Sequence, residues 1–152
     1  MKKQDANFVS FVTLLVFIGL CGQRAYGKNW GHWRGDGGNS VSTDAKPPTT
    51  WSPTENIKWK VQVPGRGSGS PVIWDDRVFV TSAVPTSDSA FEFVVICFDR
   101  KTGQQEWKQV AIIGKPHEGT HSTNGFASAS PCTDGEHVYA HFGSRGLFCY
   151  TV

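Results

Sequence analysis

Five histidines are the residues whose type and spacing come closest to a metal site in this chain of 152 residues. His137 and His141 have the spacing of a helical zinc pair, but they fall in an apolar run that predicts a strand. Residues four apart on a strand are separated by about 13 Å, which is too far to share a metal ion. His117 and His121 belong to a loop that could fold onto a metal, yet no third ligand is apparent. A solvated or hydrogen-bonded loop is therefore the favoured interpretation, and no metal site is expected.

Other polar motifs have simpler explanations than chemistry. Two Ser-x-Ser-Pro segments contain Ser68, Ser70, Ser128 and Ser130. These serines lack the strand–turn–helix context of a nucleophile, which favours loop roles. The glycine-rich residues 65–69 lack the Lys-Ser/Thr ending and the following helix of a phosphate loop. Asp75 and Asp76 are explained by a hairpin turn, because calcium needs several converging oxygens. No catalytic, cofactor-binding or metal-binding residue is predicted.

The N-terminus has the order of a secretory signal. Two lysines precede a mostly apolar run at residues 8–20, and Ala25-Tyr26-Gly27 supplies the small residues of a cleavage site. The run is shorter than the roughly 20 residues of a membrane span, so a membrane anchor or buried helix is the less favoured alternative. Lipidation of Cys21 is disfavoured because the bulky Leu20 precedes it. We predict a signal peptide at residues 1–27 and a periplasmic or extracellular protein.

Cleavage changes the charge and the cysteine count. Removing residues 1–27 leaves 12 positive and 12 negative side chains, a formal net charge of zero. Without a basic stripe, nucleic-acid binding has no support, and no membrane span is expected after cleavage. Cys97, Cys132 and Cys149 remain, and an odd number leaves at least one thiol unpaired within the chain. All three fall in apolar strand-like runs, where small buried hydrophobes are the favoured role.

The elements that must position these residues are strands. Hydrophobic residues make up 38% of the chain and aromatic residues 12%, which supports a packed core and a sheet-rich fold. Residues 28–56 form an extended lead-in, and its three tryptophans are expected to attach it to the rest of the protein by packing against it. Short apolar or alternating runs separated by turn residues then predict strands. These are 57–61, 71–74, 77–81, 91–98, 106–113, 131–133, 137–142 and 146–152. The prediction is an all-β fold.

The strands repeat. Residues 68–71 match residues 128–131, and in the same register residues 78–80 match residues 138–140. Two further pairs of segments match, 95–98 with 147–150 and 58–60 with 106–108. Four strand positions that recur about every fifty to sixty residues are typical of the blades of a β-propeller. We therefore expect four-stranded antiparallel blades, with Trp59 and Trp107 at equivalent places in successive blades.

One segment identifies a family. Residues 97–107, Cys-Phe-Asp-Arg-Lys-Thr-Gly-Gln-Gln-Glu-Trp, resemble the repeat of the pyrroloquinoline-quinone-like (PQQ-like) β-propellers, Ala-x-Asp-x-x-Thr-Gly-x-x-x-Trp. Asp99, Thr102, Gly103 and Trp107 are the motif residues. Asp99 can cap the hairpin turn and Gly103 can take positive φ. The resemblance implies that Trp107 packs between blades. The alternative is a surface tryptophan that stacks on a sugar or a quinone.

The resemblance also bears on whether the set of propeller blades is complete. A second copy of the motif begins at Cys149, has Thr151 where the family has Asp, and stops before any Thr-Gly or Trp. The 125 residues from Lys28 suffice for about two blades, whereas propellers close with four to eight. Residues 57–152 are expected to be an incomplete set of PQQ-like repeats, from the N-terminal piece of a longer protein or a truncated product.

Two functions are compatible with the resemblance. The favoured one is an exported, non-catalytic scaffold that binds an unknown protein partner in the cell envelope, like the envelope-assembly members of the family, with no cofactor. The alternative is the N-terminal fragment of a PQQ- and calcium-dependent alcohol or sugar dehydrogenase. Those enzymes hold their quinone with adjacent cysteines, a stacking tryptophan and calcium, and this chain has no Cys-Cys pair.

Overall fold

The computed structural model describes residues 29–152, and the predicted signal peptide lies outside the described residues. Seven strands account for the regular structure of this part of the chain. Its helical segments are two short 3-10 turns, η1 (Ser87–Ser89) and η2 (Gly143–Arg145). The all-β prediction is confirmed.

The first sheet has four antiparallel strands in chain order. They are β1 (Val72–Trp74), β2 (Arg77–Pro85), β3 (Phe91–Asp99) and β4 (Gln105–Gly114). The turn between β1 and β2 is formed by the two aspartates expected there, and Asp75 has a positive φ of 48°. Consecutive antiparallel strands joined by short turns give the meander of a propeller blade.

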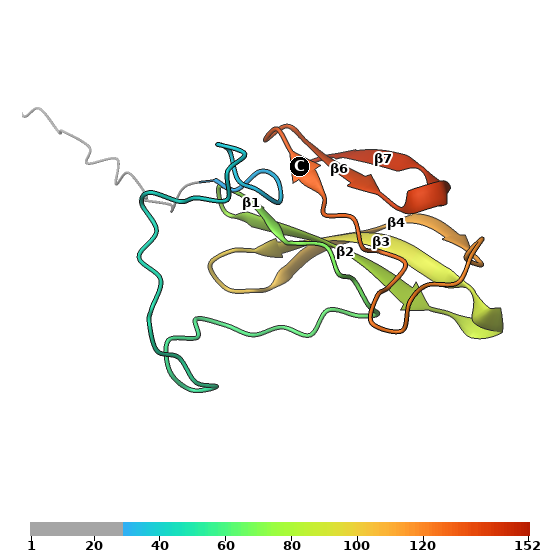
Figure 1. Cartoon of the computed structure of the whole chain (residues 1–152), viewed down its shortest axis with the longest axis horizontal. Helices are drawn as coiled ribbons and strands as arrows, with labels where there is room; N and C mark the ends of the chain where they lie inside the picture. The colour runs from blue at the N-terminus through green and yellow to red at the C-terminus, as the bar shows by residue number, and fades with distance from the viewer. Residues whose placement is uncertain (1–28) are drawn as a thin grey trace, which may run out of the picture.

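The second sheet repeats this meander with three strands. They are β5 (Cys132–Thr133), β6 (His137–His141) and β7 (Leu147–Thr151), in the order β5-β6-β7. Figure 1 shows the two sheets as stacked layers, with β6 and β7 over the first sheet. The chain therefore contains the partial β-propeller that the repeats predict.

Burial of both faces of the first sheet forms the core. Side chains alternate across a strand, so Phe93, Val95 and Cys97 of β3 face the second sheet while Val94 and Ile96 face away from it. All five side chains are 2% exposed or less. This explains the nearly continuous apolar run in β3, which is a central strand with no solvent-facing side.

The prediction of a strand at residues 57–61 is wrong. Residues 57–63 are extended but have no strand partner. They run along the far side of the first sheet from β6 and β7 (Figure 1), and Trp59 and Val63 pack against the apolar cluster on that face. Because the segment crosses a face of the sheet rather than lining an edge, its backbone has no ladder to join. The period-two pattern of residues 57–61 reflects burial of one side of the segment. Such burial does not require pairing with another strand.

The lead-in is attached mainly by its first tryptophan. Trp30 forms an isolated antiparallel bridge with Ile73, with N···O distances of 2.8 and 2.9 Å. Trp33 and Trp51 are 57% and 68% exposed, so the expectation that all three tryptophans pin the lead-in is wrong for these two. In the sequence both are flanked by polar residues, Trp33 by His32 and Arg34 and Trp51 by Thr50 and Ser52.

The cysteines also differ from expectation. Cys97 is buried, and this burial raises the pKa of its thiol to about 12. Cys132 and Cys149 are exposed, because they lie on the face of the second sheet that points away from the first. Both are paired in register with Tyr139 of the strand between them. Two strand spacings separate them by roughly 10 Å, which is too far for a disulfide.

Candidate functional site

The Asp-x-x-Thr-Gly turn between β3 and β4 is held by its own side chains. One oxygen of Asp99 accepts hydrogen bonds from both the backbone N–H and the hydroxyl of Thr102, each 2.6 Å long. These bonds lower the pKa of the Asp99 carboxyl, the hydroxyl contributing most. Gly103 has a φ of 76° and donates its N–H to the Asp99 carbonyl oxygen at 2.8 Å. The motif residues therefore make a rigid hairpin corner.

This corner is covered by Trp59. The indole N–H of Trp59 donates to the carbonyl oxygen of Arg100 at 2.9 Å. A Cβ on Gly103 would lie 2.7 Å from two atoms of the Trp59 ring, so the absent side chain is what lets the ring pack on the turn. Glycine meets two needs at this position, the positive φ and the close approach of an indole.

Trp107 packs on the face of the first sheet opposite to the one against which Trp59 packs. Across the first sheet, Phe79, Cys97 and Trp107 are in register on adjacent strands. The rings of Phe79 and Trp107 approach to 5.8 Å between centroids, passing over the small Cys97 side chain. Trp107 is half-buried against the cluster between the two sheets. A small residue at position 97 is thus what allows the two aromatic rings to meet.

The two Ser-x-Ser-Pro segments lie side by side. The backbone N–H of Ser68 donates to the Ala127 carbonyl oxygen at 3.0 Å, and that of Ser70 to the Ser130 hydroxyl at 2.8 Å. A Cβ on Gly69 would lie 2.6 Å from the Ala129 carbonyl oxygen. The serines and glycines of this region therefore join the two repeats where each enters its first strand. This is a structural role, as the sequence indicates.

A second tight turn lies between β5 and β6. One oxygen of Asp134 accepts hydrogen bonds from the backbone N–H groups of His137 and Glu136, which together lower the pKa of this carboxyl to about 2. A Cβ on Gly135 would lie 2.4 Å from the Trp74 ring. Here too an indole from the first sheet packs on a turn glycine, and the contact joins the two sheets.

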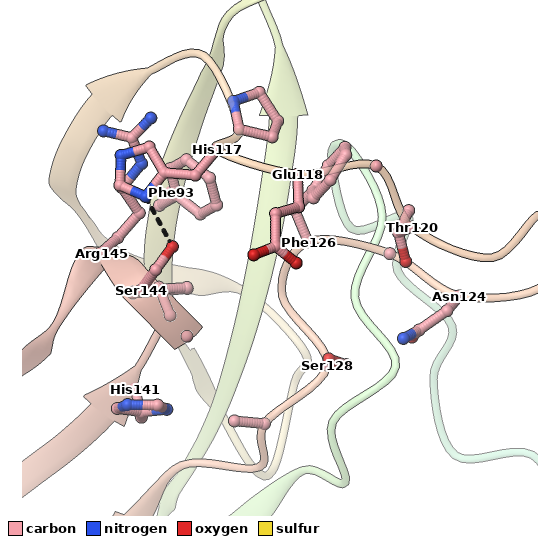
Figure 2. A pocket seen from close by; sticks show the side chains of 16 residues that line it. Phe93, His117, Glu118, Thr120, Asn124, Phe126, Ser128, His141, Ser144 and Arg145 are labelled. Carbon is pink, nitrogen blue, oxygen red and sulfur yellow. Dashed lines mark hydrogen bonds between the residues drawn. The ribbon is translucent and has the colours of Figure 1, made fainter.

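A pocket of about 430 Å³ lies at the end of the sheets near η2. Its lining comes from the β4–β5 loop, the end of β6 and η2, over the buried rings of Phe93 and Phe142. Figure 2 shows the polar side chains around it. These are His117, Glu118, Thr120, Asn124, Ser128, His141, Ser144 and Arg145. The pocket therefore combines an apolar floor with polar walls.

The histidines singled out in the sequence are used differently. His117 and His141 both line the pocket, although they come from different elements. The Nδ1 of His117 is hydrogen-bonded to the Ser144 hydroxyl at 2.8 Å, whereas His121 bonds Thr123 within its own loop. Sequence reasoning missed Arg145, because no local motif relates it to a loop nearly thirty residues earlier.

Comparison with known proteins identifies the family. The family described as outer membrane protein assembly factor BamB matches residues 19–151. The chain belongs to this PQQ-like repeat family. The resemblance inferred from the turn motif is thereby confirmed. No curated protein matches the chain significantly.

The name of the PQQ-like family raises the question of a quinone–calcium site. Within residues 29–152, no group of three or more His, Cys, Asp or Glu side chains could share a metal ion. The three cysteines of that region are also separate, two exposed on the second sheet and one buried in β3. Residues 29–152 also include no helix with the length and apolar character that a bilayer crossing requires.

The first prediction concerns the contact of Trp59 with Gly103 in this PQQ-like repeat. Gly103→Ala should lower the free energy of unfolding through the positive φ, by about 1–2 kcal/mol, and further through the clash with Trp59. Gly143→Ala is the matched control, because Gly143 has a φ of 57° and no atom within 4 Å of an added Cβ. Chemical denaturation should show the larger loss for Gly103→Ala. Equal losses would show that the indole does not pack against this turn.

The second prediction concerns Trp107. Truncation of a fully buried tryptophan costs about 3–5 kcal/mol, and the half-buried Trp107 should lose about half as much on replacement by alanine. Trp51→Ala is the control, because Trp51 is 68% exposed and should change the melting temperature little. If Trp107→Ala melts like Trp51→Ala, the structural role is wrong and a ligand-stacking role takes its place.

Proposed function

We propose that this protein is an exported, non-catalytic β-propeller scaffold that binds a protein partner in the cell envelope. The observation that supports this most is the match to the family of an outer membrane protein assembly factor along nearly the whole chain, residues 19–151. Blades of that family form the rigid layered body described above. Such a body presents loops and strand ends at defined positions, which suits it to hold another protein.

Exposed apolar side chains indicate where a partner would bind. Ile113 at the end of β4 and Leu147 at the start of β7 are 60% and 67% exposed. Both lie at the end of the sheets where the Arg145 guanidinium lies over Gly114, with its nearest atom 3.0 Å from the position of an added Cβ. Large apolar side chains exposed on strands can contribute to a protein-binding surface. We therefore assign the partner to this end of the two sheets.

Export is the first part of the proposal to test. We expect the protein purified from its native host to begin at Lys28, because residues 1–27 have the order of a cleaved signal. Mass spectrometry of the intact protein from fractionated cells measures both the mature N-terminus and the compartment. A cytosolic protein that retains Met1 would contradict export.

Partner binding is tested by photo-crosslinking in the native host. A photoreactive phenylalanine analogue placed at Ile113 or Leu147 should capture one defined envelope protein. The same analogue at Lys101, an exposed residue of the turn between β3 and β4, is the control and should not. Absence of any captured protein at the first two positions, or equal capture at Lys101, would contradict the proposed surface. Oxidation of alcohols or sugars by the purified protein with PQQ and calcium would contradict the non-catalytic role.

A further inference from the structure

The second sheet lacks a strand that the first sheet has. The first sheet has the order β1-β2-β3-β4, whereas the second sheet ends at β7. β7 corresponds to β3, because residues 147–150 match residues 95–98 in the repeat. Within residues 29–152, β4 therefore has no counterpart beside β7. The outer edge of β7 is available to another strand.

The backbone groups on this edge follow from the pairing of β7 with β6. At one end of the pair, the Phe142 N–H donates to the Gly146 carbonyl oxygen at 3.0 Å. At the other end, the Val152 N–H donates to the Glu136 carbonyl oxygen at 3.0 Å. Both bonds continue the β6–β7 register, in which every second residue of β7 bonds β6. Cys149 falls between these residues, so its backbone N–H and C=O point away from β6. Unpaired backbone groups on an edge are a template for another strand.

Residues 57–63 resemble the strand that the second sheet lacks. Residues 58–60 match residues 106–108 of β4, with Trp59 at the place of Trp107. The segment is extended and has no strand partner in the described part of the chain. Each tryptophan packs on the sheet that follows it, Trp59 on the far face of the first sheet and Trp107 against the cluster between the two sheets. Residues 57–63 therefore stand to the first sheet as β4 stands to the second.

The segment also runs in the direction of β4. The Trp59 indole bonds to Arg100 at the turn that precedes β4. Beyond the end of the segment, the Ser82 hydroxyl donates to the Pro64 carbonyl oxygen at 2.6 Å, toward the other end of the sheet. The segment is thus antiparallel to β3, as β4 is. Within one chain it cannot reach β7, because the first sheet lies between them (Figure 1).

We propose that β7 of one copy of this chain pairs with residues 57–63 of a second copy, which supplies the fourth strand of the second sheet. In the first sheet Cys97 lies opposite Trp107. The repeat therefore places Cys149 opposite Trp59 of the next copy. The contact is head-to-tail, so it repeats from copy to copy and closes a ring of two four-stranded units per copy. This assembly is independent of the envelope partner proposed above, which was placed at the ends of the strands.

Light scattering of the purified protein in reducing buffer tests the assembly. We expect the mass of about two to four copies, because propellers have roughly four to eight blades and each copy supplies two. Cys149→Pro removes the outward N–H without removing a bond between β7 and β6, and it should give a monomer. Cys149→Ser keeps this N–H and should assemble like the original protein. A monomeric original protein, or assembly of Cys149→Pro, overturns the proposal.

Crosslinking tests the register and remains decisive if Cys149→Pro does not fold. Val61 of the next copy lies diagonally from Cys149 in the expected pair, at about 7–8 Å, which a short bismaleimide spans. With Cys21→Ser and Cys132→Ser as background, Val61→Cys should give covalently linked copies. The background alone should give none, and neither should Val41→Cys, whose position in the lead-in is 61% exposed. Absence of linked copies with Val61→Cys, or equal linking in either control, overturns the proposal.

Discussion

Burial of β3 on both faces is the constraint on which the rest of the structure depends. Phe93, Val95 and Cys97 need the second sheet to cover them, and Val94 and Ile96 need residues 57–63 on the other side. Each fully buried aliphatic or aromatic side chain contributes about 1.5–3 kcal/mol relative to exposure. A lone four-stranded sheet of this sequence would expose both of these faces to water. The layered arrangement follows from the composition of a single strand.

Packing of tryptophan rings on turn glycines is the second recurring feature of the architecture. Trp59 covers Gly103 and Trp74 covers Gly135, and both glycines have positive φ in tight turns. Trp30 similarly lies against Gly35, where an added Cβ would be 2.6 Å from the ring. In each case glycine lets the backbone turn sharply and leaves a flat surface for a large aromatic ring. The Trp59 and Trp74 contacts join segments distant in sequence, whereas the Trp30 contact is local to the lead-in.

The pocket is a consequence of how the two repeats are connected. The β4–β5 loop must travel from the outer strand of one sheet to the first strand of the next, and its return is anchored by the adjacent Ser-x-Ser-Pro segments. The excursion leaves a cavity above Phe93 and Phe142 that the loop's polar side chains line. The cavity therefore lies at the junction of the two repeats.

The sequence by itself determined the strand class, the hairpin turns and the family, because alternation and turn chemistry are local properties. It also located Asp99, Thr102 and Gly103 in one corner, since their bonds span only a few residues. Whether residues 57–63 pair, and whether Cys132 and Cys149 are covered, was decided by which sheet face meets which neighbour. The hydrogen bond between His117 and Ser144 was likewise decided only by the tertiary structure. Contacts between distant segments depend on how layers stack, and a period-two pattern shows that one face is buried without identifying what buries it.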